Sequence, residues 1–218
     1  LLIYMIRFLC LLSISGSVKL VTKEILFAKG NFSSTPEWER IQQDVEESIN
    51  KVTWPESSKK FTINPIGKGN GVKPIKLSFC DKIEKKGWKL ETRMSIATRS
   101  KPGPLDATIR ISNDDKSHVF AVEWETGNIS SSHRALNKMS LGIRNGILIG
   151  GILVLPTRKL YQYLTDRVGN FAELEPYFDV WRSMRIKNGI LCVYAVEYDD
   201  ISKSVPRIVK GTDGRAKV

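Results

Sequence analysis

The chain has 218 residues, of which 41% are hydrophobic and 26% are charged. This composition excludes an intrinsically disordered chain, and the length suits a single domain. The formal net charge of +11 favours a polyanionic partner, either a nucleic acid or an anionic lipid surface.

The first 18 residues form an apolar segment whose only charge is Arg7. Its small residues near the end are typical of a secretory signal, but it is too short for a comfortable membrane span. We expect either a signal peptide or residues outside the working protein, with Met5 as the first available methionine. Residues 19–218 are expected to form one domain that ends in a basic, irregular tail at about 204–218.

Hydrophobic residues recur at helical spacing in 36–50, with Thr35 as a natural cap and Pro36 in the first turn. The next stretch, 54–74, is rich in Pro, Gly, Lys and Asn. These residue types favour an irregular, exposed connection.

Three segments with strand patterns follow, at 88–94, 105–111 and 118–125. The polar turn 113–116 joins the last two as a hairpin. Asp106 therefore lies at the start of one strand, and Glu123 and Glu125 lie at the end of its neighbour.

The rest of the chain alternates helices with strands. A serine cap and Gly146 bound a predicted helix at 131–145. The apolar run 147–156 predicts a strand with both faces covered. Two helices and a strand are expected at 157–165, 171–184 and 190–198. This alternation predicts an α/β fold with a mixed sheet.

The acidic residues of the hairpin predict a metal site. Glu123 and Glu125 share one face of a strand, and Asp106 reaches the same pocket if the hairpin forms. Crowded carboxylates repel one another unless a cation neutralises them, and Mg²⁺ prefers oxygen ligands. Beside a DNA phosphate such a site hydrolyses phosphodiesters, with Glu91 as a further candidate ligand. The same spacing also arises by chance on solvated strand edges, but apolar neighbours and the basic chain favour a site.

Several segments closely resemble the BamHI family of type II restriction endonucleases: VEWETGNISSSHRALNKMSLGIRNG, LPTRKLYQYLTDRVGNFAELEPYF, VPRIVKGTDG, IQQDVEESINKVTWPESSKKFTIN and NGVKPIK. The resemblance runs from about Lys19 to the C-terminus. It implies a PD-(D/E)xK restriction-endonuclease-like core, in which a central mixed β-sheet is flanked by helices.

The resemblance also implies catalytic roles. Asp106 and Glu123 would hold one or two Mg²⁺ ions together with the main-chain carbonyl of Trp124. Glu125 would activate water, at a position where most relatives of the wider fold have lysine. Glu91 looks like a further acidic residue near the metal, although its spacing to Asp106 is shorter than in the family.

By the same resemblance, double-stranded DNA is the partner and GGATCC is the target. The residues implied to contact base edges are Asn128, Ser130, Arg134, Asp166 and Arg167 in the major groove and Asp213 in the minor groove. The chemistry agrees, because arginine can donate twice to guanine and aspartate can accept from cytosine. Without the resemblance, Asp166 and Arg167 favour an ion pair at a helix end, and Asn128 and Ser130 favour a turn and a cap.

A palindromic target calls for a two-fold homodimer. The family packs its dimer through helices, which makes 131–145 the candidate, although its apolar residues suit a core equally. Lys138 either approaches a phosphate or is a solvated lysine, and His133 is expected to be structural.

The three cysteines, Cys10, Cys80 and Cys192, are far apart and favour small buried residues of a protein in the reducing cytoplasm. Neither a small-molecule cofactor nor a membrane partner is expected. Two other functions stay open. One is a basic DNA-binding protein without cleavage, although converging carboxylates would repel its DNA. The other is a secreted non-specific nuclease, which the apolar N-terminus favours and the cysteine count does not.

Overall fold

The computed structural model describes residues 18–67, 69–97, 102–113, 116–165 and 167–210. The predictions about residues 1–17, Asp166 and Asp213 therefore lie outside the described residues. Within the described ranges, no helix has the length and apolar character that a membrane crossing requires.

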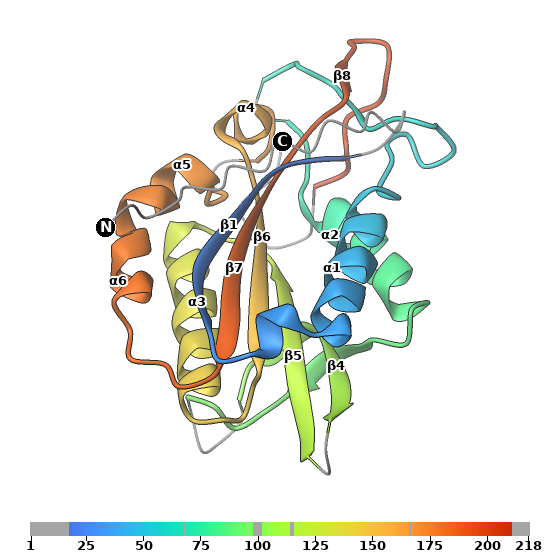
Figure 1. Cartoon of the computed structure of the whole chain (residues 1–218). Coiled ribbons are helices and arrows are strands. Elements are labelled where there is room, and N and C mark those ends of the chain that lie inside the picture. The colour runs from blue at the N-terminus through green and yellow to red at the C-terminus, as the bar shows by residue number, and fades with distance from the viewer. Residues whose placement is uncertain (1–17, 68, 98–101, 114–115, 166, 211–218) are drawn as a thin grey trace.

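A mixed sheet forms the centre of the molecule (Figure 1). Within the described residues it has six strands, in the order β1-β7-β6-β5-β4-β3. Neighbours among β5, β6 and β7 run parallel, and the other pairs run antiparallel. The strands are β1 (Lys19–Lys29), β3 (Lys89–Arg93), β4 (Pro104–Asn113), β5 (Lys116–Trp124), β6 (Gly150–Pro156) and β7 (Gly189–Glu197). A separate parallel pair joins β2 (Thr62–Ile63) to β8 (Asp200–Ile201).

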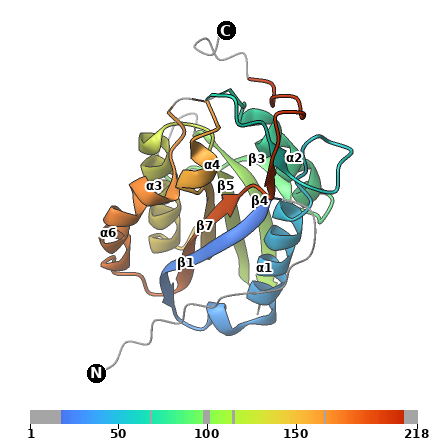
Figure 2. The same cartoon turned by 90° about the horizontal axis from the view of Figure 1, so that it is seen from above.

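Helices cover both faces of this sheet (Figures 1 and 2). One face carries α1 (Pro36–Ile49) and α2 (Lys73–Glu84). The other carries α3 (Ile129–Arg144) and α6 (Phe178–Arg182), with α5 (Phe171–Leu174) beside them. The short α4 (Arg158–Tyr161) follows β6, and two 3-10 turns, η1 (Phe32–Ser34) and η2 (Glu175–Tyr177), complete the order.

Strand β6 shows why its sequence is a continuous apolar run. All of its residues are buried. Ile152 and Val154 belong to the core under α1 and α2, whereas Leu153 and Leu155 belong to the core under α3 and α6. A central strand with both faces covered cannot alternate apolar with polar residues, so this prediction is confirmed.

Three predicted helices differ in their bounds from the structure. The helix expected at 131–145 begins at Ile129, and its cap is Asn128 rather than a serine, since the Asn128 side chain accepts from the Ser131 N–H at 3.2 Å. The helix expected at 171–184 is divided by the 3-10 turn η2, which contains Pro176. Proline lacks the N–H that a continuous helix needs there. Only 158–161 is helical in the segment 157–165.

The stretch 54–74 was expected to be exposed, and this prediction is wrong for its second half. Phe61, Ile63, Asn64 and Asn70 are all buried there. They are covered because this stretch pairs with the C-terminal segment, through β2 with β8 and through the Ile208 N–H and C=O. Strand β1 and helix α2 were not predicted at all.

Candidate active site and base-contacting residues

Three acidic residues lie on adjacent strands at the same level of the sheet. Asp106 on β4 is next to the pair Ala107↔Val122, which places it beside Glu123 on β5. On its other side, β3 and β4 pair through Leu90↔Ala107 and Thr92↔Leu105, so Glu91 and Asp106 lie between these two pairs. The antiparallel hairpin predicted from the sequence therefore does bring Asp106 to Glu123.

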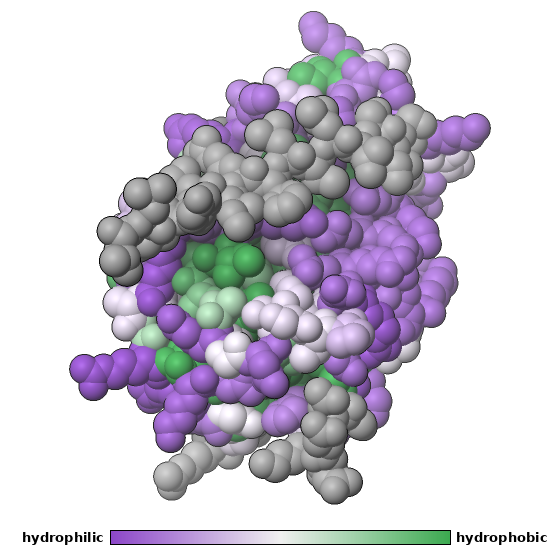
Figure 3. All heavy atoms as spheres, in the orientation of Figure 1, coloured by the Kyte–Doolittle hydropathy of each residue, from purple (hydrophilic) through white to green (hydrophobic). Residues whose placement is uncertain are grey.

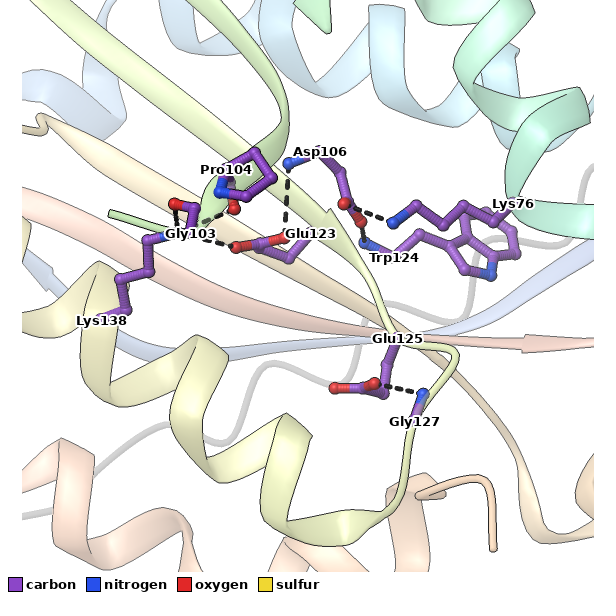
Figure 4. A network of polar contacts seen from close by, with 9 residues as sticks. All are labelled: Lys76, Gly103, Pro104, Asp106, Glu123, Trp124, Glu125, Gly127 and Lys138. Carbon is purple, nitrogen blue, oxygen red and sulfur yellow. Dashed lines mark hydrogen bonds and ion pairs between the residues drawn. The ribbon is translucent and has the colours of Figure 1, made fainter. Parts of the chain in front are cut away.

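Asp106 and Glu123 are tied together through the backbone (Figure 4). The Asp106 N–H donates to Glu123 Oε2 at 3.3 Å, and the Trp124 N–H donates to Asp106 Oδ2 at 2.8 Å. Both side chains are largely buried, with 8% and 14% of their surface exposed. Their carboxylates are thus fixed by main-chain groups of the two strands.

Two lysines approach this acidic pair from helices on opposite faces of the sheet. Lys76 of α2 donates to Asp106 Oδ1 at 2.5 Å. Lys138 of α3 lies 3.7 Å from Glu123 Oε1 and donates to the carbonyls of Gly103 and Pro104, each at 2.8 Å. Lys138 is therefore no solvated lysine, since only 15% of its side chain is exposed.

The raised pKa of Glu123 reflects the burial of two neighbouring carboxylates. Burial, followed by the charge of Asp106, raises the pKa of Glu123 from 4.5 to about 8, although Lys138 opposes this shift. For Lys76, burial lowers the pKa, but the charge and the hydrogen bond of Asp106 outweigh it and leave the pKa raised. The charge of Lys138 does not cancel the raised pKa of Glu123, so burial is the dominant cause of the shift.

Glu125 lies just beyond the end of β5 and faces a different neighbour. Its Oε1 accepts from the Gly127 N–H at 2.6 Å, and its own N–H donates to the Val154 carbonyl at 2.9 Å. Burial is the main cause that raises the Glu125 pKa, while the main-chain N–H groups of Gly127 and Thr126 lower it. In Figure 4 this carboxylate lies apart from Asp106 and Glu123.

The expected convergence of three carboxylates is therefore only partly observed. Among the described residues, no group of three His, Cys, Asp or Glu side chains is close enough to hold a metal ion. Asp106 and Glu123 nevertheless suit a hard cation, because they offer carboxylate oxygens from neighbouring strands in a largely buried place. Glu125 or Glu91 would have to turn toward them to complete a coordination sphere.

The described residues expected to contact bases lie at the start of α3 and in a neighbouring loop. Asn128 and Ser130 are exposed at the start of α3, and Arg134 is exposed one turn later. Exposed Arg167 lies in the neighbouring loop, which is joined to the residues before α3 by the Gly169 N–H and the Gly127 carbonyl at 2.8 Å. The structure thus brings the four described candidates to one region beside Glu125.

Two candidates have an unusual backbone conformation. Glu91 has φ +49° and Arg167 has φ +77°, and among the described residues these are the non-glycine positions with positive φ. Such conformations cost about 1 kcal/mol or more and are concentrated at functional sites. Glu91 and Arg167 were also candidate site residues in the sequence, so their backbone conformation favours a functional role over a purely structural one.

His133 and the cysteines show structural roles. His133 packs edge-on against Tyr177 at 4.7 Å between ring centroids and lies 5.5 Å from the Trp181 ring. Cys80 and Cys192 are free and buried, as expected, and burial raises the pKa of the Cys80 thiol to about 11. Cys10 lies outside the described residues.

The family model for the restriction endonuclease BamHI matches residues 18–215 of this chain. The type II restriction enzyme OkrAI of Oceanobacter kriegii is 48% identical over 199 residues, which are 91% of this chain and 99% of that enzyme. The type II restriction enzyme BamHI of Bacillus amyloliquefaciens is 38% identical over 184 residues, 81% of this chain and 84% of that enzyme.

The chain belongs to the BamHI family of type II restriction endonucleases.

Its fold agrees with that assignment. The crystal structure of restriction endonuclease BglII complexed with a DNA 16-mer superposes with a TM-score of 0.53. The two share 11% sequence identity, and the match covers 88% of this chain and 90% of that chain. The predicted restriction-endonuclease-like α/β fold, with a mixed sheet between helices, is confirmed.

Membership of the BamHI family makes this chain a DNA-cutting enzyme, so the alternative of a DNA-binding protein without cleavage loses its support.

Lys76 is the site residue of this BamHI-family chain that sequence reasoning missed. It lies in the NGVKPIK segment, which was used only for the resemblance. A signal existed, since Ile75, Phe79 and Ile83 recur at steps of four after a helix-starting Pro74. Recognising α2 would have placed Lys76 on a helix that packs against β4.

Proposed function

We propose that this enzyme hydrolyses DNA phosphodiester bonds at the palindrome GGATCC, with Mg²⁺, as a homodimer. The observation that carries the proposal is the buried pair Asp106 and Glu123, in which the Asp106 N–H donates to the Glu123 carboxylate and burial is the main cause that raises the Glu123 pKa to about 8. A second support is the resemblance of the segments around this pair to enzymes of the BamHI family.

Asp106 and Glu123 would hold one or two Mg²⁺ ions, with the Trp124 carbonyl and Glu91 as further ligands. A bound Mg²⁺ polarises the phosphoryl oxygen, lowers the pKa of a bound water and stabilises the leaving oxygen. Lys76 and Lys138 partly neutralise the two carboxylates before the metal binds. Once displaced, these ammonium groups are free to contact the DNA phosphates.

Glu125 would take the proton from the attacking water. Its buried setting raises its pKa, which makes it a better proton acceptor than an ordinary carboxylate. The Gly127 N–H orients the carboxylate. As the water oxygen bonds to phosphorus, the bond from phosphorus to the leaving oxygen breaks, and the leaving oxygen takes up a proton.

The specificity would come from base contacts by Asn128, Ser130, Arg134, Asp166 and Arg167 in the major groove and by Asp213 in the minor groove. The exposed positions of the described members support this assignment. Asn128 also caps α3, because its Oδ1 accepts from the Ser131 N–H. Its side-chain NH₂ group remains available to the DNA. Arginine to guanine and aspartate to cytosine fit the bases of GGATCC.

A second copy would complete the enzyme, since each subunit would contact one half of the palindrome. Leu136, Met139 and Ile143 of α3 are buried in the chain's own core, so an interface through this helix would use its partly buried residues, such as Ala135 and Leu141. Beside α3, however, Tyr177 and Val180 are 50% and 60% exposed. Figure 3 also shows a hydrophobic area in the region of β1, where Val21 and Ile25 are exposed.

The buried free thiols of Cys80 and Cys192 agree with a reducing cytoplasm.

The test is digestion of a plasmid that carries one GGATCC site, with Mg²⁺, with Ca²⁺ and without metal. Wild type with Mg²⁺ is expected to give a single linear product, and Glu125→Ala is expected to give none. Cutting that survives the loss of Glu125, or binding without any cutting by wild type, would overturn the proposal.

A further inference from the structure

We propose that Asn70 is a positioning residue for DNA specificity, because it joins the loop that ends at Arg167 to the C-terminal segment. The described part of the loop comprises 163–165 and Arg167, and the C-terminal segment comprises 205–210. The inference rests on the proposed function, in which Arg167 contacts bases in the major groove and the residues after Lys210 reach the minor groove. Asn70 itself would contact no DNA, since it is fully buried.

The side chain of Asn70 is fully used within the protein. Its Nδ2 donates to the Asn64 carbonyl at 2.7 Å and to the Tyr163 carbonyl at 2.8 Å. Its Oδ1 accepts from the Ile208 N–H at 3.1 Å. An amide side chain has two donor hydrogens and one acceptor oxygen, so these three bonds occupy both hydrogens and the oxygen.

The backbone of Asn70 extends the same connection. Its N–H donates to the Tyr163 carbonyl at 3.1 Å, and its carbonyl accepts from the Thr165 N–H at 2.8 Å. The backbones of Tyr163 and Thr165 therefore both bind the backbone of Asn70, and Arg167 follows two positions after Thr165. One buried residue thus fixes the start of the loop and, through Ile208, the C-terminal segment.

Gly71 shows how closely the two segments approach each other. Its N–H donates to the Ile208 carbonyl at 2.8 Å. A Cβ at position 71 would lie 2.0 Å from the Val209 carbonyl oxygen, which is backbone and cannot rotate away. Trp54 and Asn64 hold the same segment through the carbonyls of Pro206 and Val205, at 2.8 and 2.7 Å. The C-terminal segment therefore packs against the stretch that contains Trp54, Asn64 and Gly71.

Such a connection affects specific binding more than general affinity. Phosphate contacts tolerate small shifts, whereas hydrogen bonds to base edges require the donor and acceptor to lie in register. If Asn70 only stabilised the fold, its loss would weaken cognate and non-cognate binding alike. If it positions both base-contacting segments, its loss weakens cognate binding selectively.

The experiment compares Asn70→Ala and the isosteric Asn70→Asp with wild type in Ca²⁺. Affinity is measured for a GGATCC duplex and for a duplex with one changed base pair, and each melting temperature is recorded. We expect cognate affinity to fall about 10- to 100-fold, as for a lost base contact, with the non-cognate affinity nearly unchanged. Gly71→Ala, which displaces only the C-terminal segment, is expected to reduce the same ratio.

The matched control is Asp44→Ala, which removes another buried polar side chain, one that accepts from Trp88 Nε1 at 3.1 Å and from Lys86. It should lower the melting temperature without changing the ratio of the two affinities. A double-mutant cycle adds a second criterion: Asn70→Ala and Arg167→Ala should be less than additive for cognate binding, because the first acts through the second.

Two kinds of failure can be told apart. If wild type itself does not prefer the GGATCC duplex, the proposed function fails and the inference fails with it. If wild type shows the preference but the Asn70 variants retain it, lose both affinities equally or combine additively with Arg167→Ala, only the inference is overturned.

Discussion

The Lys76 ammonium lies 2.5 Å from Oδ1 of Asp106, although one residue belongs to a helix and the other to a central strand. The two come together because α2 packs against β4. With 8% of the Asp106 side chain exposed, this ammonium is its nearest positive charge in the absence of metal. Any metal ion that binds Asp106 must therefore compete with the Lys76 ammonium for this carboxylate.

Lys76→Met is expected to destabilise the metal-free protein by about 3–5 kcal/mol, since it leaves a mostly buried carboxylate without its partner. Added Ca²⁺ should recover more stability in the variant than in wild type, because the cation no longer has to displace the ammonium. Urea unfolding with EDTA and with Ca²⁺ measures both effects. Lys82→Met is the control, as Lys82 pairs with the exposed Asp81 in α2. Equal stabilisation of the Lys76 variant and wild type by Ca²⁺ would contradict the account.

The stability of the metal-free protein should fall as the pH rises from about 4.5 to about 8, the range between the ordinary and the raised pKa of Glu123. The folded protein binds this proton more tightly than the unfolded chain does. The resulting stabilisation is therefore complete below the ordinary pKa and lost as the pH rises through the folded pKa. Unfolding at several pH values measures the slope, and Glu123→Gln should flatten it. A slope of opposite sign would show that Glu123 is ionised in the fold.

Glu125→Gln should reduce the cleavage rate by about 10²–10⁴-fold, because a carboxamide cannot accept the proton of the attacking water. Binding of the cognate duplex should change little, since the side chain keeps its size and its bond from the Gly127 N–H. Single-turnover cleavage and equilibrium binding separate the two quantities. A variant that cuts at nearly the wild-type rate would remove Glu125 from the chemistry.

Arg167→Lys should lower cognate affinity by about 1–3 kcal/mol, although the charge is kept, because lysine lacks the two-pronged donor geometry for guanine. Non-cognate affinity should stay the same. The matched control is Arg158→Lys on exposed α4. If Arg167 contacts phosphates instead, the lysine variant will bind both duplexes almost as wild type does.

Val180→Glu should weaken the proposed dimer, because it places a charge where an exposed apolar side chain would meet the second copy. The change should have little effect on folding, since Val180 is 60% exposed. Sedimentation at several concentrations compares the variant with wild type and with Arg185→Glu, a change at another exposed position. An unchanged mass would exclude this surface.

The sequence allowed the central hairpin to be predicted because its signal is local. Alternation on both strands and a polar turn placed Asp106 beside Glu123, and β6 was recognisable as a strand covered on both sides. Strand β1 was not predicted because it lies at the edge of the sheet. Its apolar residues Val21 and Ile25 are exposed, so its sequence shows no clear alternation of apolar and polar residues. Likewise, no local signal links Asn70 to Ile208, since that contact joins residues 138 positions apart.

The site was predicted in its residue types but not in its charge balance. Asp106, Glu123 and Glu125 were identified from spacing, and their separation into a pair and a single carboxylate became visible only in three dimensions. The two lysines beside the pair come from helices: Lys138 was considered only as a phosphate contact or a solvated lysine, and Lys76 was missed because α2 was not predicted. The roles of all the candidate site residues stay predictions, and Asp166 and Asp213 also lie outside the described residues.

The most direct test of the central claim is to sequence the DNA ends that wild-type enzyme produces from genomic DNA with Mg²⁺. The account predicts that the ends fall at one fixed position within GGATCC and that Glu123→Gln produces none. Ends spread over many sequences, ends at a different palindrome, or undiminished cutting by Glu123→Gln would contradict it.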